Sequence, residues 1–382
     1  MIGNLDYTTL QQLWWIIIAI VGAFFVFLIF VQGGQTLLGQ VAETEMEKSL
    51  IITSLGRKWE LTFTTLVLFG GALFAAFPKF YATSFGGAYW VWMLILFSFI
   101  IQAVSYEYRS KENNFLGSET YELFLLINGV VGVLLIGAAV GTFYTGSNFT
   151  LDMYNRVTWN YVLFGLNLRG LEAAFSLFNL SLALFLLFNA RVTGASYLLN
   201  SIDFSSNPGL ETRLRESVKK NFLISLPFLL YVLFSILLMK GFGVDKAGVV
   251  SLVSFKYLFN LFSMPSLLVL LLAGIVLVVL GVFLTSFKTS YKGIWFNGLG
   301  TVFVGFVVLC LPALNNTAFY PSKLDLQSSL TIFNASSSMF TLTTMTYVAI
   351  GIPFVLAYIV YVWKLMDSKK ITVEEIENEE SY

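Results

Sequence analysis

Nine apolar runs, each about as long as a bilayer is thick, dominate this 382-residue chain. A helix needs about 20 residues, with a range of roughly 17–25, to cross the hydrocarbon core. Backbone groups in lipid must be hydrogen-bonded within their own segment, so runs of this length predict helices rather than barrel strands. We therefore expect an all-α integral membrane protein whose bundles contain about nine transmembrane helices, at residues 13–31, 61–77, 88–104, 122–143, 168–187, 222–239, 266–287, 296–314 and 345–363.

The distribution of Lys and Arg predicts the orientation in the membrane. The segments that follow the odd-numbered runs hold 15 of these residues, whereas the N-terminal segment and those after the even-numbered runs hold six. Positive residues stay on the cytoplasmic side, so we expect the N-terminus outside and the C-terminus in the cytoplasm. Lys48 is the first basic residue, so the first run lacks the basic flank of a signal peptide and is expected to remain as a helix.

We expect one polytopic membrane domain over residues 1–382. Its longest and most polar connection, the predicted cytoplasmic loop 190–221, joins two halves at roughly 1–190 and 222–363. An acidic tail follows at 364–382, which we interpret as a solvated or partner-contacting end rather than a site.

The composition excludes several kinds of chemistry. The chain contains no histidine, and histidine is the commonest ligand for haem, zinc and copper and the commonest general base. We therefore predict no catalytic residue and no metal site here, and expect any redox chemistry on a partner. The net charge is zero, which offers no basic surface for nucleic acid. Cys310, the lone cysteine, is expected to be a small packing residue.

Ionisable residues at the edges of the apolar runs are the candidate functional residues, because a charge near lipid is costly without a role or partner. Glu60, fixed at the interface by Trp59, lies where the chain enters the second run. It is either a proton-path carboxylate at the cytoplasmic mouth or an interfacial acid that faces water or pairs with Arg57 or Lys58. Glu122, at the inner edge of the fourth run, is interpreted as interfacial.

Two further groups of charges flank the third and fifth runs. Glu107 and Lys111 are four residues apart in the order that favours a helical ion pair. Between them, Arg109 is a candidate contact for a lipid head group, a quinone or a partner carboxylate, or else a simple positive anchor. Arg169 and Glu172 form either a local ion pair or a proton exit.

The second run also carries a face of small residues that would let another helix approach closely. We predict that this face packs against a partner, through Gly70, Gly71, Ala75 and Ala76.

Taken together, these segments resemble subunit II of cytochrome bd-type quinol oxidases over nearly the whole chain. The resemblance begins with Leu5-Asp6-Tyr7 and Trp14-Trp15 and continues through Trp59-Glu60 and the run Gly70 to Pro78. Later matching stretches are Tyr108-Arg109-Ser110-Lys111, Ser328 to Ile332, Asn334 to Ser338, and the closing Ile371 to Glu377.

The chain departs from the family pattern at two places. The family usually has Asp-Gly-Phe-Asp-x-Gly after the first helix, where this chain has Gln32 and Gln35 in place of both acids. A glutamine cannot ionise, so any proton or cation role of those acids is lost or moved. In the family's Trp-Asp-Gly-Asn-x-Val-Trp, the acid is replaced by Glu60, and the Gly, Asn and second Trp are absent.

The resemblance implies a non-catalytic subunit of a heterodimeric terminal oxidase in the bacterial cytoplasmic membrane. Subunit I of such enzymes carries haem b and haem d, oxidises quinol and reduces oxygen to water, while subunit II supports it. In some members subunit II offers a cytoplasmic proton route or holds a structural quinone. The implied partners are subunit I, membrane lipids and a small accessory membrane peptide. The alternative is a secondary transporter, which would place polar or charged groups at mid-bilayer.

Overall fold

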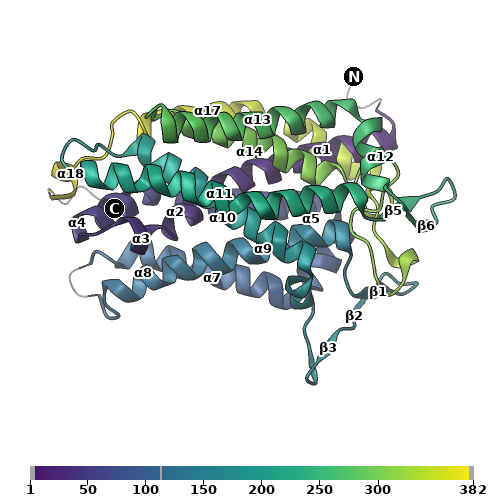
Figure 1. The fold of residues 1–382 in the computed structure, drawn as a ribbon. Coiled ribbons are helices and arrows are strands. Elements are labelled where there is room, and N and C mark those ends of the chain that lie inside the picture. The colour runs from purple at the N-terminus through teal and green to yellow at the C-terminus, as the bar shows by residue number, and fades with distance from the viewer. Residues whose placement is uncertain (1–4, 112–113, 378–382) are drawn as a thin grey trace.

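The computed structural model describes residues 5–111 and 114–377, and its body is a bundle of long, roughly parallel helices (Figure 1). Among the described residues, eight helical segments are long and apolar enough to cross a membrane. A pair of shorter helices that meet at 43° brings the number to nine if the pair is one span. The prediction of an all-α membrane protein with about nine spans is confirmed, while its orientation stays a prediction.

The helices follow the apolar runs of the sequence. The membrane-length segments are α1–α2 (Tyr7–Leu28, Phe30–Gln35), α4–α5 (Glu45–Gly56, Trp59–Ala76), α7 (Tyr89–Tyr108), α8–η3–α9 (Ser118–Ile127, Asn128–Gly132, Val133–Thr145), α10 (Leu177–Ser201), α11 (Pro208–Leu238), α13 (Pro265–Phe287), α14 (Gly293–Cys310) and the bent pair α16–α17 (Met339–Ala349, Ile352–Met366). The short elements are α3 (Leu38–Val41), α6 (Pro78–Tyr81), η2 (Ala82–Gly86), η4 (Leu171–Phe175), α12 (Lys256–Ser263), η5 (Leu326–Ser328), α15 (Ile332–Ala335) and α18 (Val373–Glu377).

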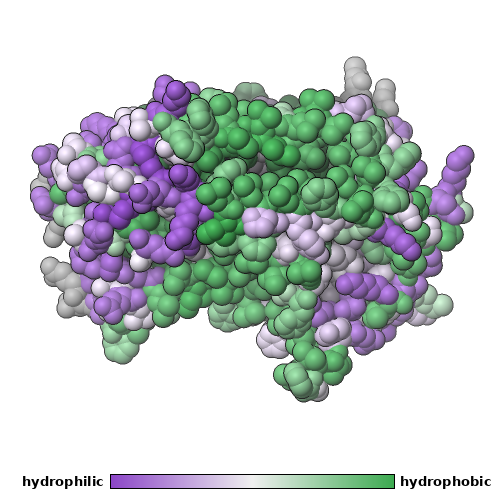
Figure 2. Space-filling model, in the orientation of Figure 1, coloured by the Kyte–Doolittle hydropathy of each residue, from purple (hydrophilic) through white to green (hydrophobic). Residues whose placement is uncertain are grey.

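The two ends of the bundle differ in structure. One end, here called the hairpin end, carries the three antiparallel pairs that occur among the described residues: β1–β2 (Phe149–Leu151, Val157–Trp159), β3–β4 (Val162–Leu163, Leu166–Asn167) and β5–β6 (Gly241–Val244, Val250–Val253). The other, the charged end, carries α3, α4 and α18, whereas α1 begins at the hairpin end (Figure 1). A broad apolar belt separates two polar caps (Figure 2), as expected for a protein that spans a bilayer.

Helix α10 lies at the centre of the bundle, where it packs against α2, α9 and α11. Small residues permit its close approach to α2. A Cβ on Gly33 would lie 1.8 Å from the backbone oxygen of Ala190, and one on Gly194 would lie 2.4 Å from the nitrogen of Gly34. Since any side chain at Gly33 or Gly194 would collide with backbone, glycine is required at this crossing.

The predicted fifth span, 168–187, is wrong at its start. Leu166–Asn167 forms β4 and Leu171–Phe175 forms a 3₁₀ turn, so α10 begins only at Leu177. The backbone turns at Gly165 and Gly170, whose φ angles are +79° and +98°. These angles suit glycine and interrupt a helix, and the apolar residues around them therefore build a hairpin.

The predicted loop 190–221 is also much shorter than expected. Helix α10 continues to Ser201 and α11 begins at Pro208, so only residues 202–207 connect them. Polar residues here extend the helices beyond the apolar belt instead of forming a loop. The described part of the acidic tail packs on the chain itself, because Ile371 pairs with Ile202 and Glu375 contacts Arg57; residues 378–382 lie outside the described residues.

Candidate functional site: a buried row of amides beside Trp59

The structure separates the two members of the predicted Trp59–Glu60 pair. Trp59 is the first residue of α5 and is 9% exposed, and its ring stacks on Tyr106 of α7 with centroids 5.8 Å apart and planes at 9°. Glu60 is exposed and forms no ion pair with any described residue. The predicted pairing of Glu60 with Arg57 or Lys58 is wrong, because Arg57 contacts Glu375 and Lys58 contacts Asp367 at 2.8 Å.

Behind Trp59 lies a row of buried amide side chains, here called the amide row: Gln32, Gln35, Gln102 and Asn128. The Gln35 amide donates to the hydroxyl of Tyr106 at 3.0 Å, and the Gln32 amide donates to Gln102 at 3.3 Å. Asn128 donates to the hydroxyl of Ser98 at 3.3 Å. All four side chains are at most 2% exposed, so three segments far apart in sequence share one polar interior.

Several polar atoms of the amide row lack a hydrogen-bond partner among the described residues. They are Gln32 Oε1, Gln35 Oε1, Gln102 Nε2 and Asn128 Oδ1. An unpaired buried polar group costs about 1–3 kcal/mol, and most buried polar atoms are paired with protein or ordered water. Four orphaned atoms in one row therefore mark a place suited to water molecules or to a small polar ligand.

Local backbone geometry places these amides. Asn128 begins η3, a π-helical turn between α8 and α9, and such turns occur frequently at functional sites. Glycine lets η3 approach its neighbours. A Cβ on Gly129 would lie 2.6 Å from the backbone oxygen of Gln32, and one on Gly132 would lie 2.9 Å from the hydroxyl of Ser98. The glycines thus bring α2, α7 and η3 into contact around the amides.

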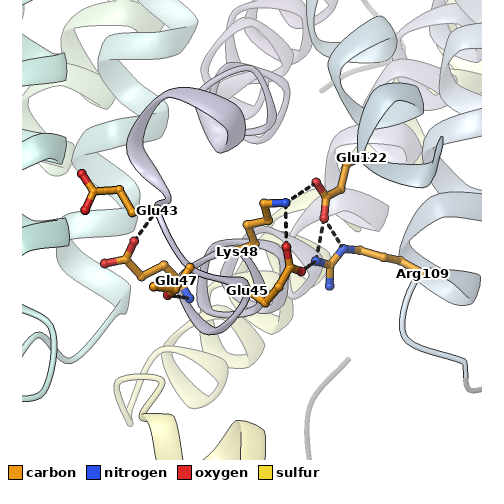
Figure 3. Close-up of polar contacts among 7 residues, drawn as sticks. Glu43, Glu45, Glu47, Lys48, Arg109 and Glu122 are labelled. Carbon is orange, nitrogen blue, oxygen red and sulfur yellow. Dashed lines mark hydrogen bonds and ion pairs between the residues drawn. The ribbon is translucent and has the colours of Figure 1, made fainter. Parts of the chain in front are cut away.

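Arg109, predicted as a free contact, is held in an ion-pair network at the charged end (Figure 3). Its guanidinium binds Glu122 at 2.7 Å and Glu45 at 3.2 Å, and Lys48 binds Glu45 at 2.8 Å and Glu122 at 3.0 Å. Arg109 and Glu122 are only 9% and 14% exposed. The network ties α4 to the ends of α7 and α8, and the role of Arg109 as a lipid, quinone or partner contact stays a prediction.

A second ion-pair group fixes the other side of α4. Arg213 of α11 binds Glu47 at 2.6 Å and Glu43 at 3.1 Å. The hydroxyl of Thr44 caps α4 by accepting from the backbone of Glu47, and acids in the first helical turn interact favourably with the helix dipole. Helix α4 is therefore clamped between α11 and the α7–α8 corner.

The remaining predicted ion pairs are absent from the described residues. Glu107 and Lys111 are both exposed and do not pair. Arg169 does not pair with Glu172 either; the Glu172 carboxylate instead accepts from the Gly170 backbone at 2.8 Å and from an asparagine side chain. Sequence spacing suggested both pairs, but tertiary contacts and turns decide where these side chains point.

The small residues of α5 divide between two faces. Gly70 and Ala76 are buried against the chain itself, whereas Gly71 is exposed and a Cβ there would meet no atom within 4 Å. Ala75 is intermediate. The exposed face of α5 continues through Val67 and Phe74, which are 57% and 61% exposed. The predicted packing face is thus only partly free for a partner.

A separate apolar cavity of about 330 Å³ is lined by residues of α1, α5, α6, η2, α7, α9, α10, α11, α13 and α14. Its walls include the side chains of Phe69, Phe85, Trp92, Phe185 and Leu229. Phe85 and Trp92 stack with centroids 3.7 Å apart. The cavity is lined almost entirely by hydrocarbon, so its ligand would be an apolar ring or chain.

No cluster of three or more Cys, Asp or Glu side chains suited to a metal ion occurs in the part of the chain that the structure describes. The whole chain also lacks histidine. The chain therefore offers no imidazole as an axial ligand for haem. The site that this chain does provide is a membrane-embedded, uncharged polar row beside a clamped charged end.

Such a fold and site define a polytopic membrane protein with a buried, uncharged polar row. Comparison with known proteins identifies its family. The model of the family described as "Cytochrome bd terminal oxidase subunit II" matches residues 10–366, and the chain belongs to this family. It is thus part of a quinol oxidase, an oxidoreductase complex, and this decides against the transporter alternative.

Individual relatives agree with this family assignment. Cytochrome bd-I ubiquinol oxidase subunit 2 of Escherichia coli K12 is 27% identical over 397 aligned positions, covering 98% of each chain. Cytochrome bd ubiquinol oxidase subunit 2 of Bacillus subtilis is 26% identical over 149 positions, covering 38% of this chain and 43% of the relative. A chain in the structure of bd oxidase from Geobacillus thermodenitrificans shares the fold, with a TM-score of 0.61 and 14% sequence identity. The match covers 95% of this chain and 100% of that chain.

Sequence reasoning missed most of the amide row. It noted Gln32 and Gln35 only as replacements for acids and did not single out Gln102 or Asn128. A signal was present, since each of the latter two is a carboxamide inside an otherwise apolar run, where a polar group is expensive unless it has partners.

Proposed function

We propose that this chain is the haem-free supporting subunit of a bd-type quinol oxidase in the bacterial cytoplasmic membrane, with the charged end inside the cell. The partner would be a subunit I that carries haem b and haem d, oxidises quinol and reduces oxygen to water. Family membership over residues 10–366 carries this proposal. The absence of histidine from the whole chain supports it, because haem needs axial ligands that the partner must then supply.

The partner packs, in this proposal, on the outward face of α5. Thr64, Val67, Gly71 and Phe74 lie along this face at helical spacing and are exposed. A glycine with open space above it lets a second helix come close, which is how membrane helices associate without a hydrophobic driving force. A bulky side chain at Gly71 should therefore reduce the amount of haem-bearing partner that co-purifies with this subunit.

The amide row is proposed to carry protons toward the partner as a chain of ordered waters. Oxygen reduction consumes protons, and taking them from the cytoplasm lets the reaction charge the membrane. Glu60 lies at the charged end beside Trp59, where it can gather protons. The orphaned amide atoms support bound waters, and the uncharged row would conduct by exchanging hydrogen bonds rather than by ionising.

Two variants test the proton route. Glu60→Gln and Gln102→Leu should slow quinol-dependent oxygen consumption while the complex still assembles with full haem content. Gln11→Leu is the matched control, because Gln11 is equally buried but bonds to Phe333 and Ser336, away from the amide row. Wild-type turnover in both Glu60→Gln and Gln102→Leu would end the proposal.

A membrane quinone is proposed to occupy the apolar cavity as a structural component. The cavity volume of about 330 Å³ and its hydrocarbon walls support an isoprenoid chain or an apolar ring. Leu229→Trp would fill it from α11, whereas Leu223→Trp places the same ring on an exposed position of the same helix. Solvent extraction of each purified complex should recover less quinone from the first variant alone; equal recovery would reject the site.

A small accessory peptide is proposed to pack beside α16–α17. Helix α17 has no buried residue, and Phe340, Val348 and Phe354 are 81%, 74% and 77% exposed. Such surfaces suit lipid or another membrane helix. A photo-crosslinking residue at Phe354 should capture a short polypeptide in the native membrane, and capture of lipid alone would contradict the proposal.

A further inference from the structure

A second cavity, of about 230 Å³, opens at the hairpin end and has a mixed lining. Its floor is apolar and comes from α7 and α9, including Val91, Leu135 and Ala138. Its rim is polar and comes from the hairpin segments and loops, including Glu172 and Lys323. An apolar floor at the end of membrane helices with a polar rim above it is the arrangement that an amphiphile fills.

The rim carries one negative and one positive group that do not touch each other. Glu172 is half-buried, and each of its two carboxylate oxygens accepts a single neutral hydrogen bond, from Asn148 and from the Gly170 backbone. Each oxygen therefore keeps capacity for a further donor. Lys323 is tied by its backbone to Ser147 at 2.9 Å, and among the described residues its ammonium forms no ion pair with Glu172.

The Glu172 carboxylate nevertheless acts on Lys323 at a distance. Partial desolvation lowers the pKa of Lys323, and the nearby Glu172 carboxylate opposes that shift. Glu172 and Lys323 thus line one pocket as opposite charges without forming an ion pair with each other. A ligand with both an anionic and a cationic group would pair with each, whereas a purely anionic one would meet the Glu172 carboxylate as a like charge.

We propose that this cavity binds the head group of a zwitterionic aminophospholipid from the leaflet at the hairpin end. The ammonium group binds Glu172 and the phosphate binds Lys323, while the acyl chains leave over the apolar floor. The membrane source is favoured over a free phosphate compound because the floor joins the hydrophobic interior: Ser84, Trp92 and Ala139 line both this pocket and the larger apolar cavity. The proposal does not depend on the oxidase activity.

The test measures the lipids that stay bound to the purified oxidase complex. The complex is reconstituted in nanodiscs of equal parts phosphatidylethanolamine and phosphatidylglycerol, extracted in mild detergent and examined by native mass spectrometry. We expect phosphatidylethanolamine to be retained in preference. Glu172→Gln should lower its retention about tenfold, since a charged hydrogen bond is lost. Glu119→Gln, an exposed acid at the charged end, should retain it as the wild type does.

A second variant shows whether a loss of lipid in Glu172→Gln could come from misfolding. Lys323 is exposed, so Lys323→Gln leaves the fold intact, and it should also reduce phosphatidylethanolamine retention about tenfold. Preference for phosphatidylglycerol, occupation by quinone instead of phospholipid, or unchanged retention in Lys323→Gln would each overturn the proposal.

Discussion

Replacing Gly71 of α5 by leucine should weaken assembly of the complex without harming the fold of this subunit. Gly71 is exposed, and a Cβ at this position would meet no atom within 4 Å. Leucine is also a better helix former than glycine by up to about 1 kcal/mol. Any loss in Gly71→Leu must therefore arise where α5 meets another polypeptide.

The expected size of the effect follows from overpacking. Inserting a bulky side chain into a close contact costs typically about 1–3 kcal/mol, which corresponds to roughly 5- to 150-fold weaker association. The assay purifies the complex through a tag on this subunit and measures the haem absorbance per mole of subunit. Gly71→Leu should co-purify much less haem than the wild type.

A matched control separates packing from glycine loss in general. Gly39 in α3 is also exposed, with no atom within 4 Å of a Cβ, but it lies at the charged end and not on α5. Gly39→Leu should retain the wild-type haem ratio. If Gly71→Leu retains it as well, α5 does not pack on the haem-bearing partner through this face.

Three further changes test other parts of the structure. Arg109→Gln should destabilise the complex by about 2–3 kcal/mol, because Glu122 keeps only its lysine partner; an unchanged thermal transition would contradict this. Gly33→Ala should cost about 3 kcal/mol or more, since the added Cβ would lie 1.8 Å from a backbone oxygen of α10, and a normal yield of folded protein would count against the α2–α10 crossing. The Asp325 carboxylate accepts a hydrogen bond from the Ser328 hydroxyl, and this bond lowers the pKa of Asp325 below its usual value of 3.8. The bond therefore stabilises the loop around Asp325 fully at a pH above 3.8, and this stabilisation is lost as the pH falls through the lowered pKa. Digestion of the loop by an acid protease should accelerate over that range in the wild type but not in Asp325→Asn, and identical pH profiles would refute the assignment.

The sequence predicted the helices well because bilayer thickness sets a length that apolar runs must meet. The same rule failed where apolar residues do not lie in a helix. Residues 168–175 count as part of the predicted run 168–187, yet they follow the β3–β4 hairpin, and Gly170 at positive φ leads them into a 3₁₀ turn. The apolar composition of a run reports its polarity, but it does not predict the positive φ angles at Gly165 and Gly170.

The candidate site was less predictable because its contacts join distant segments. Spacing suggested that Glu107 pairs with Lys111, but Arg109 is the residue that lies inward, with partners from α4 and α8. The amide row likewise forms only when the glycines of η3 let α2, α7 and η3 meet. Local rules describe one helix at a time, whereas these networks depend on how helices pack.

The dependence of this subunit on a haem-bearing partner is tested most directly by purifying it in mild detergent from cells that do or do not express subunit I. With subunit I present, we expect a coloured complex that consumes oxygen when supplied with quinol, and without it a colourless and unstable chain. A stable, solitary chain that transports a substrate into liposomes, or a complex that lacks haem, would contradict the account.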